Sequence, residues 1–405
     1  DAGADAYNIA IGHNAGLSVT TGLYNTVVGG EALLTNLDGD NNTAIGYQAL
    51  KTMEADSDGG GGNTAIGSGA MRDCTTGENN TAIGVLALGD GTLTGDNNIG
   101  IGTNSGMLLT TGNENILIGV AAGDSLTTGS QNVVVGRNAL QTEDAHGRNV
   151  AVGYSALKVQ DAGADAYNVA IGYNAGVAVT TGTSNVLLGS QAGDALTTGS
   201  HNVAVGRGAL GTEDTGGKNT AIGHEALNTL DAGGNGNDTA VGFEAGKAMT
   251  TGVANTLVGS QSGISLTSGS WNTSVGYNSL VNEDANGYNT AVGAGTLQTQ
   301  DAGADAYNVA VGYNAGNDIT TGIKNTIIGG LAGGALTTSS ENVVIGYGAL
   351  AAEDTRGKVV AIGYRALNQQ AADADTYNVA IGNQAGYSVT TGLKNNLLGG
   401  LAGDA

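Results

Sequence analysis

The chain has 405 residues, a formal net charge of −23, 73 glycines and no proline. Such an acidic surface excludes nucleic acid and anionic membranes as partners, because no basic stripe neutralises their phosphates. Apolar residues make up 40% of the chain and fall at fixed positions, which argues against disorder. Cys74 is the only cysteine, so disulfides within the chain are excluded.

No apolar run has membrane length and no signal peptide is present, so we expect no membrane insertion. Residues 1–7 match residues 161–167, and residues 401–405 break off partway through a repeat. We therefore expect a segment of a longer array whose targeting and capping parts lie elsewhere.

One stretch, Asn-Val-Ala-Ile-Gly-Tyr-Asn-Ala at residues 168–175, recurs in close copies along the chain. Counted at its glycine, which we call the anchor glycine, there are 23 copies, mostly 17 residues apart. A fixed short period predicts a solenoid of stacked coils, which needs no second core. Residues 1–405 are thus predicted to form one continuous array, less regular over 1–118, where residues 56–62 are an insertion, and regular over 119–405.

A longer period is superimposed on the first. From Gly172 the steps between anchor glycines run 17, 17, 17 and 19 residues and then repeat, so every fourth anchor lies 70 residues on. Four coils therefore make one super-repeat.

The pentapeptide Asn-x-Ala-Ile-Gly predicts a short strand, since Val, Ile and Thr lie between Gly, Asn and Asp turn residues. A helix is disfavoured because the recurring glycines would each cost about 1 kcal/mol. A 17-residue coil has room for two short strands and two turns. We predict an all-β fold, a parallel β-solenoid whose coils, stacked about 4.8 Å apart, form a rod of roughly 110 Å.

Both faces of this strand are apolar. Val169 and Ile171 point to one side, which we assign to the core, and Ala170 points to the other. The residues equivalent to Ala170 are often large, as at Leu117, Leu187, Leu257, Ile327 and Leu397. A strand with two apolar faces is normally covered twice. We expect the coil interior to cover one face and a neighbouring chain the other, most simply in a homotrimer.

The coil interior is predicted to hold a constant volume. A glycine four residues after the anchor is paired with an apolar residue three places later, as in Gly176 and Val179. A leucine there is paired with a glutamate, as in Leu140 and Glu143. Packed cores resist both voids and overfilling, so a bulky group that moves between two slots is expected.

The residue four before the anchor is asparagine in 21 of 23 coils, with Asp238 and Val359 as the exceptions. Stacked amides can hydrogen-bond to the next coil and satisfy turn backbone groups at the same time. We predict a structural asparagine ladder that includes Asn168, Asn185, Asn202, Asn219, Asn255, Asn272, Asn289 and Asn308.

The repeats Asn-Thr-Ala-Ile-Gly (63–67 and 219–223) and Asn-Val-Ala-Ile-Gly (168–172) resemble the head repeats of YadA-type trimeric autotransporter adhesins. They are equally similar to repeats of trimeric bacteriophage tail-fibre proteins. The resemblance implies a left-handed β-roll, three chains around one axis, and a place outside the cell, at the cell surface or on a virion. A glycan or receptor would be bound through parts not in this chain. Longer coils, the super-repeat and the absence of a stalk or tip depart from the adhesin pattern.

Acidic residues recur in the turns of adjacent coils. Asp144 and Asp161 occupy the same place in neighbouring coils, with Glu143 alongside. Stacked like charges are unfavourable unless they are solvated, protonated or bridged by a cation, and oxygen-rich clusters suit Ca²⁺. Solvated, outward-pointing carboxylates and a Ca²⁺ site are the two alternatives. The candidate ligands are Glu143, Asp144, Asp161, Glu213, Asp214, Asp231, Glu283, Asp284 and Asp301.

Other signals favour structural roles. The threonine pairs, such as Thr180 and Thr181, are typical turn formers. Tyrosines after the anchor, such as Tyr173, either cover the flank or offer a platform for sugars. No metal or base constellation includes the four histidines, so we expect no enzyme and no cofactor beyond a possible Ca²⁺.

The sequence therefore predicts a non-enzymatic structural rod of an extracellular or viral fibre, an adhesin or tail-fibre shaft that presents a tip. The alternative is a module whose flank itself binds a glycan, ice or another surface. That alternative requires one exposed array repeated on every coil, whereas the exposed positions are expected to change with the four-coil rhythm.

Overall fold

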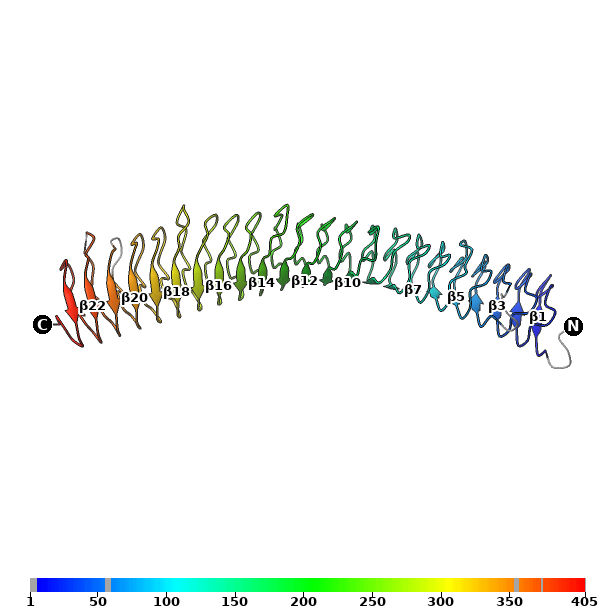
Figure 1. The fold of residues 1–405 in the computed structure, drawn as a ribbon. Coiled ribbons are helices and arrows are strands. Elements are labelled where there is room, and N and C mark those ends of the chain that lie inside the picture. The colour runs from blue at the N-terminus through cyan, green and yellow to red at the C-terminus, as the bar shows by residue number, and fades with distance from the viewer. Residues whose placement is uncertain (1–5, 55–59, 353–356, 373, 405) are drawn as a thin grey trace. The chain divides into compact units, whose positions relative to one another are not determined.

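The structure is a computed structural model that describes residues 6–54, 60–352, 357–372 and 374–404. The first five residues and most of the predicted insertion lie outside this description. The chain divides into two compact units, Asp1–His201 and Asn202–Ala405, and each is a stack of coils (Figure 1). The residues that the structure describes include no helix long and apolar enough to cross a membrane.

Each coil contributes one strand of three residues, and its last residue precedes the anchor glycine. The strands of the first unit are β1 (Ile9–Ile11), β2 (Thr26–Val28), β3 (Thr43–Ile45), β4 (Thr64–Ile66), β5 (Thr81–Ile83), β6 (Ile99–Ile101), β7 (Ile116–Ile118), β8 (Val133–Val135), β9 (Val150–Val152), β10 (Val169–Ile171) and β11 (Val186–Leu188). Those of the second unit are β12 (Val203–Val205), β13 (Thr220–Ile222), β14 (Thr239–Val241), β15 (Thr256–Val258), β16 (Thr273–Val275), β17 (Thr290–Val292), β18 (Val309–Val311), β19 (Thr326–Ile328), β20 (Val343–Ile345), β21 (Val360–Ile362), β22 (Val379–Ile381) and β23 (Asn396–Leu398).

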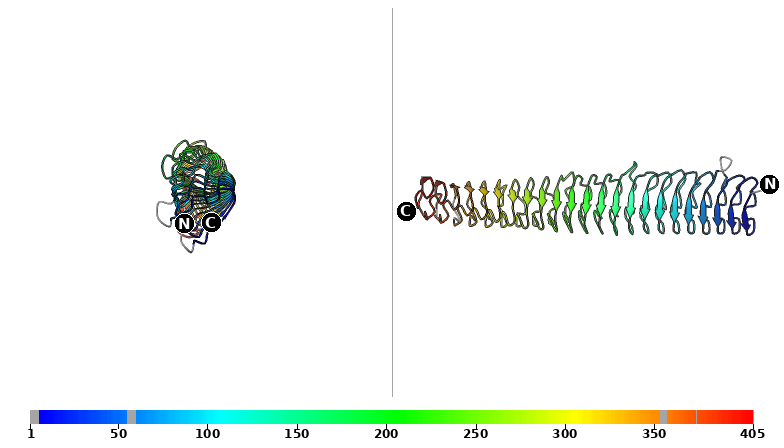
Figure 2. Two further views of the ribbon diagram at one scale, coloured as in Figure 1. Left: turned by 90° about the vertical axis from the view of Figure 1, so that its right-hand side faces the viewer. Right: turned by 90° about the horizontal axis from the view of Figure 1, so that it is seen from below.

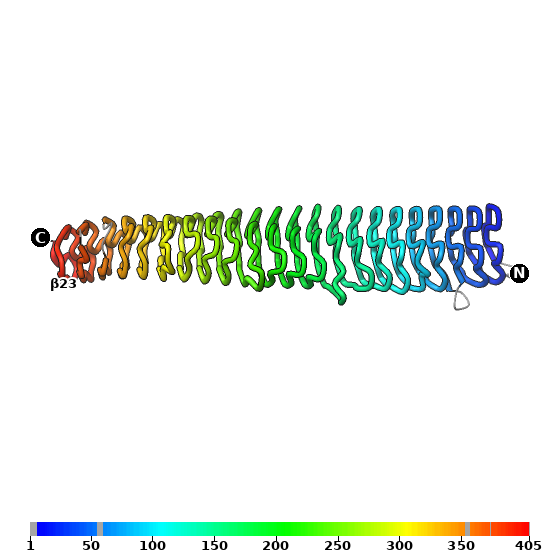
Figure 3. Tube along the Cα trace, turned by 90° about the horizontal axis from the view of Figure 1, so that it is seen from above, coloured from blue at the N-terminus to red at the C-terminus, as the bar shows by residue number. Residues whose placement is uncertain are grey.

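Within each unit, successive strands pair in parallel and in register. Val169 pairs with Val186 and Ile171 with Leu188 across β10 and β11, and the same register recurs from β12 onward in the second unit. Figure 2 shows the strands of each unit side by side along one flank, and Figure 3 shows the coils following one another in chain order. The prediction of an all-β parallel β-solenoid with coils of about 17 residues is confirmed.

The expected second strand of each coil is absent among the described residues, and the strands are three residues long instead of five. The physical reason lies in the backbone after the anchor glycine. Gln48 and Leu50 both have positive φ, at 57° and 49°, and the same alternation recurs in other coils. Left-handed residues spaced by two bend the chain continuously, so the rest of the coil cannot extend into a strand.

The anchor glycine combines a positive φ with a close chain approach. Gly172 has φ 145°, and a Cβ placed on it would lie 2.4 Å from the carbonyl oxygen of Gly189 in the next coil. No other residue type fits both constraints, which is why glycine ends each strand.

The assignment of the two strand faces was wrong. Ala170 and Leu187, the middle residues of β10 and β11, are fully buried in the coil interior. Ile171 and Val186 point outward and are 37% and 39% exposed. Alternation shows that a strand has two faces but not which one is inside. The middle residue is the one inside, whether it is small, as in β10, or large, as in β11. The Val/Ile side is therefore the face that the coil leaves partly exposed.

The two positions predicted to share a bulky residue, four and seven residues after the anchor glycine, both pack inside the coils. Gly176 lies against Leu187 of the next coil, because a Cβ on Gly176 would be 2.6 Å from Leu187 Cδ1. Val179 fills the later slot of the same coil and is fully buried. In the alternative coil type, Leu140 and Glu143 occupy the two slots, and both are fully buried.

Candidate functional site

Three groups of acidic side chains recur in the turns of adjacent coils, after β8 and β9, after β12 and β13, and after β16 and β17. Their ligand atoms lie within 4.8 Å of one another in each group. The groups are Glu143, Asp144, His146 and Asp161; Glu213, Asp214 and Asp231; and Glu283, Asp284 and Asp301. The structure thus brings together all nine predicted acidic residues, in three sets. Carboxylate oxygens at this separation are ligands of the kind that Ca²⁺ takes in proteins.

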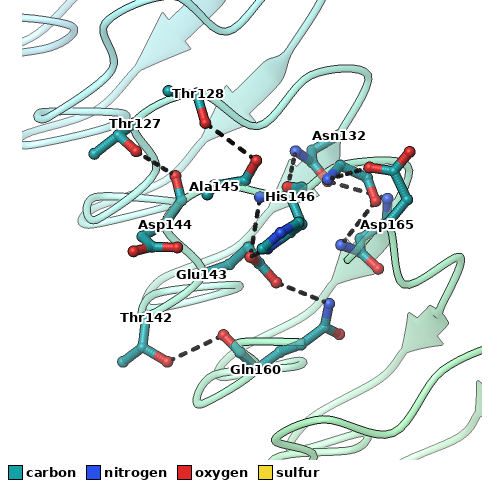
Figure 4. A network of polar contacts seen from close by, with 12 residues as sticks. Thr127, Thr128, Asn132, Thr142, Glu143, Asp144, Ala145, His146, Gln160 and Asp165 are labelled. Carbon is teal, nitrogen blue, oxygen red and sulfur yellow. Dashed lines mark hydrogen bonds and ion pairs between the residues drawn. The ribbon is translucent and has the colours of Figure 1, made fainter. Parts of the chain in front are cut away.

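The glutamate of each group points inward, not into solvent. Glu143 is fully buried, and its Oε1 accepts hydrogen bonds from the backbone N–H of His146 at 3.1 Å (Figure 4). His146 Nδ1 lies 3.3 Å from the same oxygen, and Gln160 Nε2 donates to Oε2 at 3.2 Å. The alternative in which all carboxylates point outward is therefore wrong for this glutamate, which holds the turn together from inside.

The equivalent glutamates make related contacts with different partners. Glu213 accepts from the N–H of Gly216 at 2.6 Å and from that of Ala232 at 3.3 Å. Glu283 accepts from the N–H of Asn286 at 3.2 Å and from its Nδ2 at 3.0 Å. Each glutamate thus closes the turn that follows it by bonding to the backbone three residues on.

Burial changes the proton affinity of these glutamates. Loss of solvation raises the pKa of Glu143 and of Glu213 and raises the pKa of Glu283 to about 7. For Glu283 the neighbouring charges of Asp284 and Asp301 act in the same direction. The exposed aspartates are the more accessible oxygen donors, because the glutamates already accept hydrogen bonds from the turn.

The predicted asparagines line the buried edge of the coils and link each coil to the next. Asn168 Oδ1 accepts from the backbone N–H of Asn185 at 2.8 Å, and Asn168 Nδ2 donates to the carbonyl of Gly182 at 2.7 Å. The side chain therefore bridges two backbone groups of the following coil. The same donation to the next coil's turn is made by Asn185, Asn202, Asn255, Asn272 and Asn308.

Two predicted ladder members depart from this pattern. Asn289 Nδ2 contacts Glu283 Oε2 at 3.5 Å. Asn219 Nδ2 is buried without a hydrogen-bond partner among the described residues, although Asn219 Oδ1 accepts from the N–H of Asp238. Both precede 19-residue coils, in which two extra residues move the usual carbonyl acceptor.

Sequence reasoning missed three residues of these networks. His146 was assigned to no constellation, although its spacing of three from Glu143 matches the backbone contact that the glutamate makes. Gln160 contacts Glu143 from the next coil, and its Oε1 accepts from Asn168 Nδ2 at 3.0 Å. Asp238 was noted only as an exception to the asparagine pattern.

Several exposed tyrosines stack in pairs on adjacent coils. The rings of Tyr154 and Tyr173 are nearly parallel with centroids 5.4 Å apart, and those of Tyr288 and Tyr307 are 4.9 Å apart. Each stacked contact covers one face of each ring in the pair, which reduces the ring surface open to a ligand.

The chain matches no model of a known protein family, and no curated protein matches it. The resemblance of its repeats to adhesin and tail-fibre repeats therefore stays a prediction.

Proposed function

We propose that this chain is a non-enzymatic structural shaft, part of an extracellular or viral fibre whose ends carry other functions. The observation that supports this most is the repetition of one local structure. In β13, β14 and β15 the same three positions pair in the same register, coil after coil. Backbone bonds between coils and buried asparagines give such a stack cohesion along its axis, the property that a shaft needs.

The proposal treats both units as one continuous stack of coils, left-handed as the resemblance of the repeats implies. Small-angle X-ray scattering tests this directly. At about 4.8 Å per coil, the account predicts a maximum dimension of roughly 110 Å. A maximum dimension near half that value would show that the two units fold back on each other and would contradict a shaft.

A second candidate function, binding of a solid surface through the flank, is favoured by one observation. The last residue of every described strand is Ile, Val or Leu and points outward, which gives the repeated array that such a module requires. Co-sedimentation with ice or insoluble polysaccharide tests it. Retention that disappears when outward residues are replaced by lysine would support this candidate over the shaft.

A further inference from the structure

The strongest unassigned feature is a charge-free apolar surface on the strands. We define the outer face as the first and last residues of each three-residue strand. The last residue is Ile, Val or Leu in all 23 described strands, and the first is Ile, Val or Thr in all but β23. In a chain with a net charge of −23, no described strand carries a charged residue on this face.

The outer face is exposed on coil after coil. Ile45, Ile66 and Ile83 on successive coils are 36%, 37% and 38% exposed, whereas the alanines between the outward residues are fully buried. The exposure is partial because each side chain packs against its equivalents in the coils above and below. What remains is a flat, regular surface and not a set of scattered side chains.

The exposed apolar area of one unit is at the upper end for a monomer, and the area of both units together is large enough for a stable interface. A fully buried aliphatic side chain corresponds to roughly 100 Å² of apolar surface. Away from the ends of the chain, some outward side chains are 36–42% exposed and the others are half-buried. At about a quarter exposed on average and two per coil, each unit presents on the order of 500 Å². Monomeric proteins rarely expose more than about 300–600 Å² in one patch, and stable interfaces bury about 800 Å² per partner.

The regular spacing of the side chains on the outer face indicates which partner can cover it. Outward side chains recur at the strand spacing along the axis, so a partner can interdigitate with every coil only if it has the same spacing. A second copy of this chain meets that condition over its whole length. It also buries no unpaired charge, because its own outer face is equally free of charged residues.

We propose that the outer face is covered by a second copy of this chain, packed strand face to strand face. This interface adds a lateral partner to the proposed shaft. It rests on the shaft proposal only where the contact runs over both units. It also relocates the interface expected of a homotrimer, from the Ala/Leu side of the strands to the Val/Ile side.

Sedimentation equilibrium tests the proposal with matched triple variants. The outer-face variant carries Ile101→Lys, Ile171→Lys and Val241→Lys. The control carries Thr111→Lys, Thr181→Lys and Thr251→Lys, which places the same charges at exposed turn positions of the same coils. The wild type and the control are expected to have a mass of two or three times 39.6 kDa. In the outer-face variant the dissociation constant should rise roughly 100-fold or more.

A variant with threonine at the same three outer positions covers the case in which lysine impairs folding. Threonine already begins many of the strands, so the coil should form, and association should weaken about tenfold. A monomeric wild type would overturn the proposal, as would an outer-face variant that associates as tightly as the control. Both results are independent of the scattering experiment, which measures length and not mass.

Discussion

Asn255 donates both its backbone N–H and its Nδ2 to Oδ1 of Asp238, at 2.8 and 3.2 Å. The second oxygen, Asp238 Oδ2, is buried and has no hydrogen-bond partner among the described residues. An asparagine in this place would present Nδ2, as Asn185 does to the carbonyl of Gly199. The carboxyl group therefore fits the ladder best when protonated. Burial raises the pKa of Asp238 to about 7, and the charge of Glu213 adds to the effect.

Asp238→Asn should remove a pH dependence of stability from the second unit. The folded state keeps the proton up to about pH 7, whereas the unfolded chain loses it near the ordinary pKa of 3.8. Stability from this group is therefore fully present below pH 3.8 and lost as pH rises through about 7. At pH 8, hydrogen exchange around Asn255 should be slower in the variant, by about 1–3 kcal/mol of local opening free energy. Equal exchange in both proteins at pH 8 would refute this.

Asn272→Asp should make local stability depend on pH in the same way at a second position of the asparagine ladder. Asn272 Oδ1 accepts from the N–H of Asn289 at 3.0 Å, and its Nδ2 donates to the carbonyl of Asn286 at 3.1 Å. An aspartate keeps the first contact and loses the second unless it is protonated. Local exchange should therefore accelerate between pH 5 and pH 8. Asn272→Ala is the matched comparison, because it loses both contacts at every pH and should cost about 1–3 kcal/mol throughout.

Glu283→Gln should stabilise the protein above neutral pH. The pKa of the buried Glu283 is raised to about 7, so the stability that it contributes is present below its ordinary pKa of 4.5 and lost as pH rises through about 7. Glutamine keeps an oxygen for the N–H of Asn286 and carries no charge. Thermal melting should show a gain at pH 8.5 that largely vanishes at pH 5. The exposed Asp284→Asn should change melting much less, and an equal gain there would point to general charge reduction instead.

Gly172→Ala should disrupt stacking far more than Gly163→Ala. Both glycines have positive φ, at 145° and 69°, so alanine is strained at either position. Only at Gly172 would the new Cβ collide with the next coil, since nothing lies within 4 Å of a Cβ on Gly163. Gly163→Ala should cost about 1 kcal/mol and Gly172→Ala several times more, measured by urea unfolding. Equal losses would mean that φ alone fixes the glycine.

The sequence was sufficient for the period, the parallel solenoid and the grouping of the acidic turns. Each depends on spacing alone, because in-register stacking converts a fixed period directly into contacts between coils. Asn168 and Asn185 could be placed one coil apart in this way, as could Asp144 and Asp161.

The orientation of side chains could not be read from the same pattern. Ala170 and Ile171 are both apolar, so polarity did not distinguish inside from outside, and the larger residue was wrongly placed in the core. Glu143 was weighed as a surface residue, because its burial depends on backbone N–H groups that only the folded turn brings to it. The second strand was expected because propensity does not reveal left-handed positions at residues such as Leu50.

The covered outer face can be tested most directly by electron paramagnetic resonance between copies. Nitroxide labels would be attached to Ile171→Cys in a Cys74→Ala background, with Thr181→Cys of the same coil as the off-face control. Because packed sheets lie about 10 Å apart, the labels at Ile171→Cys should show strong dipolar coupling within about 20 Å, and those at Thr181→Cys much weaker coupling. Uncoupled labels at Ile171→Cys, as mobile as those of the control, would contradict the account.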